Sequence, residues 1–177
     1  MRVTLTSPFP ADSMPDLFRW LAHSTISKSG AFPSDLEAFE KISKQGMENV
    51  KNWAVHHEGK LIGAVIFEPL GLMGGRAYVA SSRSVWGTGL MDEAALEGIR
   101  LVFDSDPRIS YIFSMVIANN APALSFNRRI GLRLKNVLPL YGMHNGRTLD
   151  MNIFEITREQ FEARRIFEAT RPKCLAA

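Results

Sequence analysis

The sequence predicts a mixed α/β protein (α+β), in which one central mixed sheet is flanked by helices. Helical patterns come first and a run of three strand patterns follows. A loop with two glycines then opens an amphipathic helix, and a strand, a helix and a hairpin complete this order. The length of 177 residues suits one domain, and no repeat or linker divides it, so we expect residues 1–177 to form a single domain.

The first part of the chain is expected to supply one short strand and two helices. Residues 3–5 fit a strand, and residues 12–23 fit a helix with Leu17 on its apolar surface. A second helix is expected to begin at Ser34. Ser34 and Glu37 have the spacing of a capping box, in which each side chain bonds the backbone N–H of the other residue.

Three strands are expected in the next stretch. Residues 52–57 and 61–67 fit two strands joined by the turn 58–60, and 71–75 fit a flexible connection rich in glycine. Residues 76–82 then fit a third strand.

The centre of the chain predicts a helix, a strand and a second helix. The first helix begins at Leu90 and stops at Asp106-Pro107. Residues 110–117 form a nearly continuous apolar run, as in a strand covered on both faces. The second helix starts at 119–122, runs through Arg129 and is closed by Gly131. The predicted buried side of the first helix comprises Met91, Ala94, Ala95, Gly98, Ile99 and Val102.

The last part of the chain predicts a hairpin and a final helix. Strands at 132–140 and 149–154 flank the turn Asn145-Gly146. Thr157 and Gln160 have capping-box spacing, which predicts that the final helix opens there.

The charge pattern argues against a nucleic-acid partner. The net charge is +3, and the densest basic cluster, at 128–135, has no interleaved aromatic side chains for base stacking. We therefore interpret that cluster as a solvated face.

The cysteine count and the start of the chain predict a cytoplasmic protein. Cys174 is the only cysteine, so no internal disulfide can form, which suits a reducing compartment. Residues 1–10 contain no long apolar core, so neither a signal peptide nor a membrane partner is expected. The sequence does not decide between a monomer and a homodimer.

The loop Ser84-Val85-Trp86-Gly87-Thr88-Gly89 before Leu90 predicts an anion site. Two glycines one residue apart allow a tight bend with several N–H groups turned toward one point. The following helix adds unpaired N–H groups and the positive end of its dipole, an arrangement that suits phosphate. Trp86 is interpreted as a packing anchor within this loop.

This order of segments resembles the GNAT N-acetyltransferase superfamily, in its bacterial or phage-encoded type. The resemblance spans about 53–161. Gly87 and Gly89 match the signature Gln/Arg-x-x-Gly-x-Gly/Ala, with Ser84 at the Gln/Arg position and Arg83 beside it. The segment 120–132 resembles the second signature, Asn-x-x-Ala followed by Gly-Phe.

The resemblance implies an acetyl-CoA site between two strands that splay apart. Backbone groups of one strand would contact pantetheine, the glycine loop would hold the diphosphate, and Asn120 would touch the pantetheine arm. The implied acetyl-CoA residues are Ala77, Tyr78, Val79, Ser84, Val85, Trp86, Gly87, Thr88, Gly89, Leu90 and Asn120.

The family's usual acid and base are replaced in this chain. Asn127 stands where the resemblance implies a tyrosine acid, and Met115 stands where some members carry a glutamate base. Asn127 can donate a hydrogen bond but is a poor proton donor. Catalysis would then rest on alignment of the reactants or on substitute groups.

Three substitute groups are candidates, each with a plainer alternative. Glu68 could collect a proton through water, or be a solvated carboxylate before Pro69. Ser114 could face the thioester, or bond to backbone in the core. Tyr141 could be a displaced acid, or pack in the last hairpin. The histidines and Cys174 lack metal-ligand spacing, so no metal is expected.

We therefore expect an acetyl-CoA-dependent N-acetyltransferase that acts on a primary amine of a small molecule or a protein. The alternative is a catalytically weak or inactive GNAT-fold protein with a binding or structural role. The segment 24–49, where family members shape the acceptor site, indicates no single substrate charge.

Overall fold

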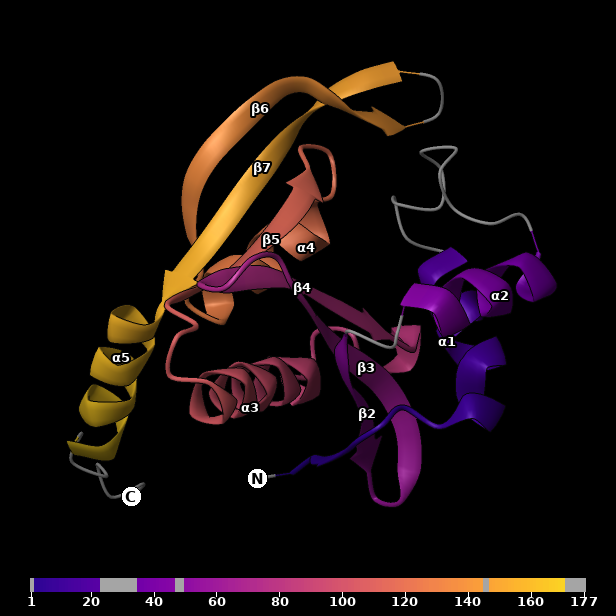
Figure 1. The fold of residues 1–177 in the computed structure, drawn as a ribbon, viewed down its shortest axis with the longest axis horizontal. Helices are drawn as coiled ribbons and strands as arrows, with labels where there is room; N and C mark the ends of the chain where they lie inside the picture. The colour runs from indigo at the N-terminus through magenta and orange to yellow at the C-terminus, as the bar shows by residue number, and fades with distance from the viewer. Residues whose placement is uncertain (1, 23–34, 47–49, 145–146, 171–177) are drawn as a thin grey trace.

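The computed structural model describes residues 2–22, 35–46, 50–144 and 147–170, which form one mixed sheet with helices on both faces (Figure 1). This confirms the predicted fold class. The sheet has the order β1-β2-β3-β4-β5-β7-β6. Its strands are β1 (Thr4–Thr6), β2 (Lys51–His57), β3 (Lys60–Pro69), β4 (Gly74–Ser81), β5 (Tyr111–Ile117), β6 (Arg133–His144) and β7 (Arg147–Thr157). The helices are α1 (Met14–Ala22), α2 (Leu36–Gly46), α3 (Leu90–Ser105), α4 (Ala121–Arg129) and α5 (Arg158–Thr170), with short 3-10 turns η1 (Ala11–Ser13) and η4 (Arg83–Val85).

Two apolar clusters cover the two faces of the sheet. Side chains alternate along a strand, so Val65 and Phe67 of β3 belong to the cluster that contains α3. Ala64, directly before Val65, belongs with Leu17 of α1 and Phe39 of α2 to the other cluster. The sheet therefore has an α3 face and an α1/α2 face, and a side chain's position along its strand decides which one it reaches.

The predicted central helix is confirmed as α3. All six residues of its predicted apolar side are buried. Gly98 allows the helix to approach β3 closely, because a Cβ at this position would lie 2.7 Å from Val65 Cγ1.

Strand β4 begins at Gly74, earlier than the sequence predicts, so Gly74 and Gly75 belong to the strand and not to the predicted flexible connection. Close neighbours explain both glycines. A Cβ on Gly74 would lie 2.6 Å from the ring of Tyr111, and one on Gly75 would clash with the Glu68 carbonyl oxygen and lie 2.6 Å from the ring of Phe67. Glycine is therefore needed at these two positions because a side chain would not fit, and not because the backbone is flexible.

Helix starts and the last hairpin differ from the prediction in detail. The predicted helix 12–23 is η1 followed by α1, and the predicted ends His23 and Ser34 lie outside the described residues. Asp35 Oδ1 accepts a hydrogen bond of 2.8 Å from the backbone N–H of Ala38, which caps α2. Strands β6 and β7 are longer than predicted, and the Asn145-Gly146 turn lies outside the described residues.

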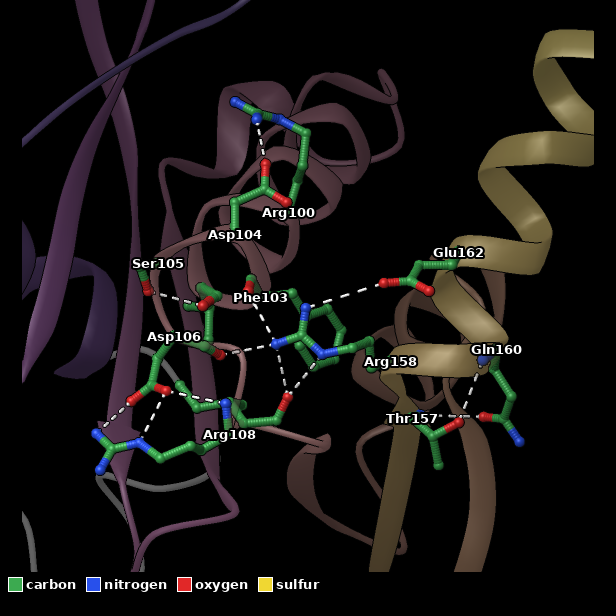
Figure 2. A network of polar contacts seen from close by, with 12 residues as sticks. Arg100, Phe103, Asp104, Ser105, Asp106, Arg108, Thr157, Arg158, Gln160 and Glu162 are labelled. Carbon is green, nitrogen blue, oxygen red and sulfur yellow. Dashed lines mark hydrogen bonds and ion pairs between the residues drawn. The ribbon is translucent and has the colours of Figure 1, made fainter.

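The predicted capping box at the start of α5 is confirmed. Gln160 N–H donates to Thr157 Oγ1 at 3.2 Å, and Thr157 N–H donates to Gln160 Oε1 at 3.1 Å. The adjacent Arg158 ties this helix to the end of α3 (Figure 2). Its Nη2 donates to the carbonyl oxygens of Phe103, Asp106 and Ile109 at 2.8, 2.7 and 2.8 Å.

Candidate functional site

Strands β4 and β5 separate soon after they pair. Their parallel ladder joins three residue pairs and ends at Arg76 and Phe113, whereas β4 continues to Ser81 and β5 to Ile117. Ala77, Tyr78 and Val79, three of the predicted cofactor residues, follow the last pair directly. In a sheet, backbone groups alternate between the two neighbouring strands, so this edge of β4 presents N–H and C=O groups to the gap.

The glycine loop lies at the far end of β4 and leads into α3. Gly87 and Gly89 have φ values of 75° and 80°, a region that favours glycine. Apart from its two chain neighbours, a Cβ built on Gly87 would meet no atom within 4 Å, so the space at this position is open. Helix α3 begins directly after Gly89 and directs its first N–H groups and its positive dipole end at the loop.

Several backbone amides of the predicted anion site donate hydrogen bonds within the loop itself. The N–H groups of Val85, Trp86 and Thr88 donate to the carbonyl oxygens of residues 82, 83 and 85 at 3.3, 3.1 and 3.3 Å. Leu90 N–H lies 3.3 Å from Thr88 Oγ1. Within the described part of the chain, the amides left to meet an anion are those of Gly87, Gly89, Met91 and Asp92.

Trp86 is exposed, so its interpretation as a packing anchor is wrong. The residue is 54% exposed, and its Nε1 donates to Ser81 Oγ at 3.2 Å. The Arg83 guanidinium lies 5.7 Å from the ring centroid. Ser84, at the family's Gln/Arg position, contacts Ser82 through the two hydroxyls at 2.8 Å.

Two ion pairs flank the first turn of α3, and the sequence analysis missed both. Arg129 of α4 donates to both oxygens of Asp92, at 2.8 and 3.0 Å. Arg2 contacts Glu93 through its backbone N–H and its guanidinium, at 2.9 and 2.6 Å. The backbone bond and the nearby guanidinium hold the pKa of Glu93 below its usual value, so this carboxylate stays charged.

Ser114 and Asn127 are brought together on the α3 face, beyond the last β4–β5 pair. Ser114 Oγ donates to Asn127 Oδ1 at 2.6 Å, and Asn127 Nδ2 donates to the Ala123 carbonyl oxygen at 2.9 Å. Asn127 is 5% exposed. Its amide oxygen therefore accepts the single hydroxyl proton of Ser114, which can serve another acceptor only when the hydroxyl turns away from Asn127.

Asn120 serves as the N-cap of α4. Its side-chain oxygen accepts from Ala123 N–H at 3.2 Å. The cap fixes the start of α4 at the end of β5, beside the gap between the strands.

A second polar cluster lies on the α1/α2 face. Glu68 Oε2 accepts hydrogen bonds from Arg76 Nη2 at 2.8 Å and from the Tyr78 hydroxyl at 2.9 Å. Burial raises the pKa of Glu68, but these bonds and the charge of Arg76 outweigh it, so the pKa lies below the ordinary value. Burial and the Glu68 carboxylate raise the pKa of Tyr78. Glu68 is thus charged and Tyr78 neutral near pH 7.

Tyr141 lies apart from both clusters. Ile117, the last residue of β5, is opposite Met151, and Met151 is opposite Leu138 of β6, so Tyr141 lies beyond the end of β5. It is 65% exposed, which also contradicts packing in the hairpin.

Neither a membrane span nor a metal cluster is found in the part of the chain that the structure describes. No helix there combines the length and the apolar character needed to cross a bilayer. The same residues contain no group of three or more side chains suited to hold a metal ion.

Comparison with known proteins gives one family match and many similar structures. A family model described as "Acetyltransferase (GNAT) domain" matches residues 2–133. A search of curated proteins found no match. A variant of spermidine N-acetyltransferase SpeG from Vibrio cholerae aligns with a TM-score of 0.79 and 13% identity, over 93% of this chain and 98% of that chain. Spermidine N-acetyltransferase from Vibrio cholerae in complex with CoA and spermine aligns with a TM-score of 0.77 and 14% identity, over 91% of this chain and 98% of that chain.

Proposed function

The chain belongs to the GNAT acetyltransferase family, and we propose that it transfers the acetyl group of acetyl-CoA to a primary amine. One observation carries the proposal: β4 and β5 part after three pairs, and the open glycine bend lies at the end of β4. Together they offer an extended backbone edge for the pantetheine arm and a cluster of amides for the diphosphate.

The residues present fit this placement. The open space at Gly87 leaves room for a phosphate, and the amides of Gly87, Gly89 and Met91 supply donors. The edge of β4 at 77–79 would pair with the amide groups of pantetheine. Acetyl-CoA supplies an activated thioester, in which attack of a neutral amine on the carbonyl carbon forms the amide and breaks the C–S bond.

Two groups are placed to move protons in that reaction. Ser114, whose hydroxyl donates to Asn127 in the structure, would turn that proton toward the departing sulfur on the α3 face. Glu68, on the α1/α2 face, would attract the positively charged acceptor and take up its proton through water. Its low pKa makes it a weak base, so its electrostatic contribution is expected to be the larger one.

The experiment measures binding and turnover separately. Acetyl-CoA should raise the thermal unfolding midpoint, because a ligand that binds only the folded state stabilises it. Released CoA thiol should then appear with at least one amine in a panel that includes spermidine, spermine and peptides with a free N-terminus or lysine. The absence of any acetyl-CoA binding would refute the proposal. Binding without turnover on any amine would support the catalytically weak alternative.

A further inference from the structure

Arg2 lies beside the glycine loop although it is far from it in sequence. A Cβ built on Gly89 would lie 3.3 Å from Arg2 Nη2. The guanidinium also contacts Glu93, with Nη2 to Oε1 at 2.5 Å and Nε to Oε1 at 2.6 Å. The backbone of Arg2 is fixed on both sides, by its N–H bond to Glu93 and by His57 Nδ1, which lies 2.9 Å from its carbonyl oxygen. The guanidinium of Arg2 is therefore held beside the N-terminus of α3.

The charge of Arg2 offsets a negative charge in the first turn of α3. Asp92 and Glu93 lie in the first turn of α3, where they stabilise the helix through its dipole. The same two carboxylates would repel a diphosphate bound at that end. Arg129 offsets Asp92, and Arg2 offsets Glu93. Arg2 Nη2 also lies 3.3 Å from the position that a Cβ on Gly89 would take, so this guanidinium is close to the glycine loop.

We propose that Arg2 neutralises Glu93 and so allows the first turn of α3 to accept the diphosphate of CoA. The inference rests on the proposed function and adds a residue from outside the loop to it. Arg2 is a positioning and charge-compensating residue, not a catalytic one.

The test compares the dissociation constant for CoA among four variants by titration calorimetry. Arg2→Gln leaves Glu93 uncompensated and should weaken CoA binding about three- to tenfold at low salt, with a smaller effect at high salt. Arg2→Gln/Glu93→Gln removes both charges and should return the affinity to within about twofold of wild type. Glu93→Gln alone should bind CoA at least as tightly as wild type.

Arg100→Gln is the matched control. It removes the same charge from α3, and its guanidinium is likewise paired, with Glu97 and Asp104. It lies about 15 Å along the helix from Leu90, so CoA affinity should stay unchanged. Thermal unfolding of each variant without ligand checks the fold, and if Arg2→Gln fails to fold, Glu93→Gln alone decides.

The outcomes separate this inference from the proposed function. Wild-type protein that does not bind CoA overturns both. Wild-type binding with an unchanged Arg2→Gln overturns the role of Arg2 alone. A double variant as weak as Arg2→Gln, or a Glu93→Gln variant weaker than wild type, overturns charge compensation.

Discussion

Ser114 of β5 donates a hydrogen bond of 2.6 Å to the side-chain oxygen of Asn127 on α4. The two residues are 13 positions apart, and Asn127 is itself held by the Ala123 carbonyl oxygen. Asn127 stands where the family resemblance implies a proton-donating tyrosine. The pair therefore replaces one acidic side chain with a hydroxyl and an amide that orients it.

Replacement of Ser114 by alanine should lower kcat about ten- to hundredfold and leave the KM for acetyl-CoA nearly unchanged, because the hydroxyl would act on the departing sulfur. Loss of one hydrogen bond should cost about 1 kcal/mol of unfolding free energy. Ser105→Ala is the control, since Ser105 bonds the Val102 carbonyl oxygen at the far end of α3. Equal kcat values for the two variants would remove Ser114 from the mechanism.

Gly87→Trp should abolish CoA binding, because the new side chain would occupy the open space in which the phosphate is placed. Gly59→Trp is a matched control. Gly59 has the same φ of 75°, and a Cβ there also meets no atom within 4 Å, but it lies in the β2–β3 turn. Both variants should lose about 1–2 kcal/mol of stability from the left-handed backbone. Calorimetric titration with CoA should then separate them, and equal affinities would contradict the placement.

The Glu68–Arg76 pair predicts a stability difference that depends on pH. The pKa of Glu68 in the folded protein lies below its ordinary value of 4.5, so the pair stabilises the protein above that pH. The contribution is lost as the pH falls through the folded-state pKa. Arg76→Gln should therefore cost up to about 1 kcal/mol at neutral pH and much less in acid. Urea unfolding over this pH range measures it, and a constant difference would show that Glu68 is not the cause.

Arg158→Ala should destabilise the fold by about 2–3 kcal/mol, because the carbonyl oxygens of Phe103, Asp106 and Ile109, at and after the end of α3, lose one shared donor. Arg108→Ala is the comparison. Arg108 is exposed and pairs with Asp106, so its loss should cost much less stability than the loss of Arg158. Denaturant unfolding of both variants checks this prediction, which fails if the two losses are alike.

Local patterns predicted most of the fold. The apolar period of α3, the reciprocal cap at Thr157 and Gln160, and the Asn120 start of α4 each lie within a few residues, so the sequence displays them directly. The prediction of a loop at Gly74 and Gly75 is wrong because the atoms that exclude a side chain there belong to other segments. They are the Tyr111 ring at Gly74, and the Glu68 carbonyl oxygen and Phe67 ring at Gly75.

The site was predicted less completely, because its parts come from distant segments. The sequence predicts the glycine bend. It does not show that the amides of Val85, Trp86 and Thr88 donate hydrogen bonds within the loop. Arg2 and Glu93 are 91 residues apart, and no local spacing joins them. The resemblance drew attention to Asn127, but only the structure pairs it with Ser114.

The brief parallel ladder has an energetic consequence for the whole molecule. A full ladder between β4 and β5 would satisfy backbone groups that here are left unmatched between the two strands. The cohesion of the two halves of the sheet must then come from elsewhere, chiefly from side chains buried against α3 and from Arg158. The gap between β4 and β5 is stable because the side-chain packing on both faces of the sheet contributes more free energy than the missing backbone hydrogen bonds would.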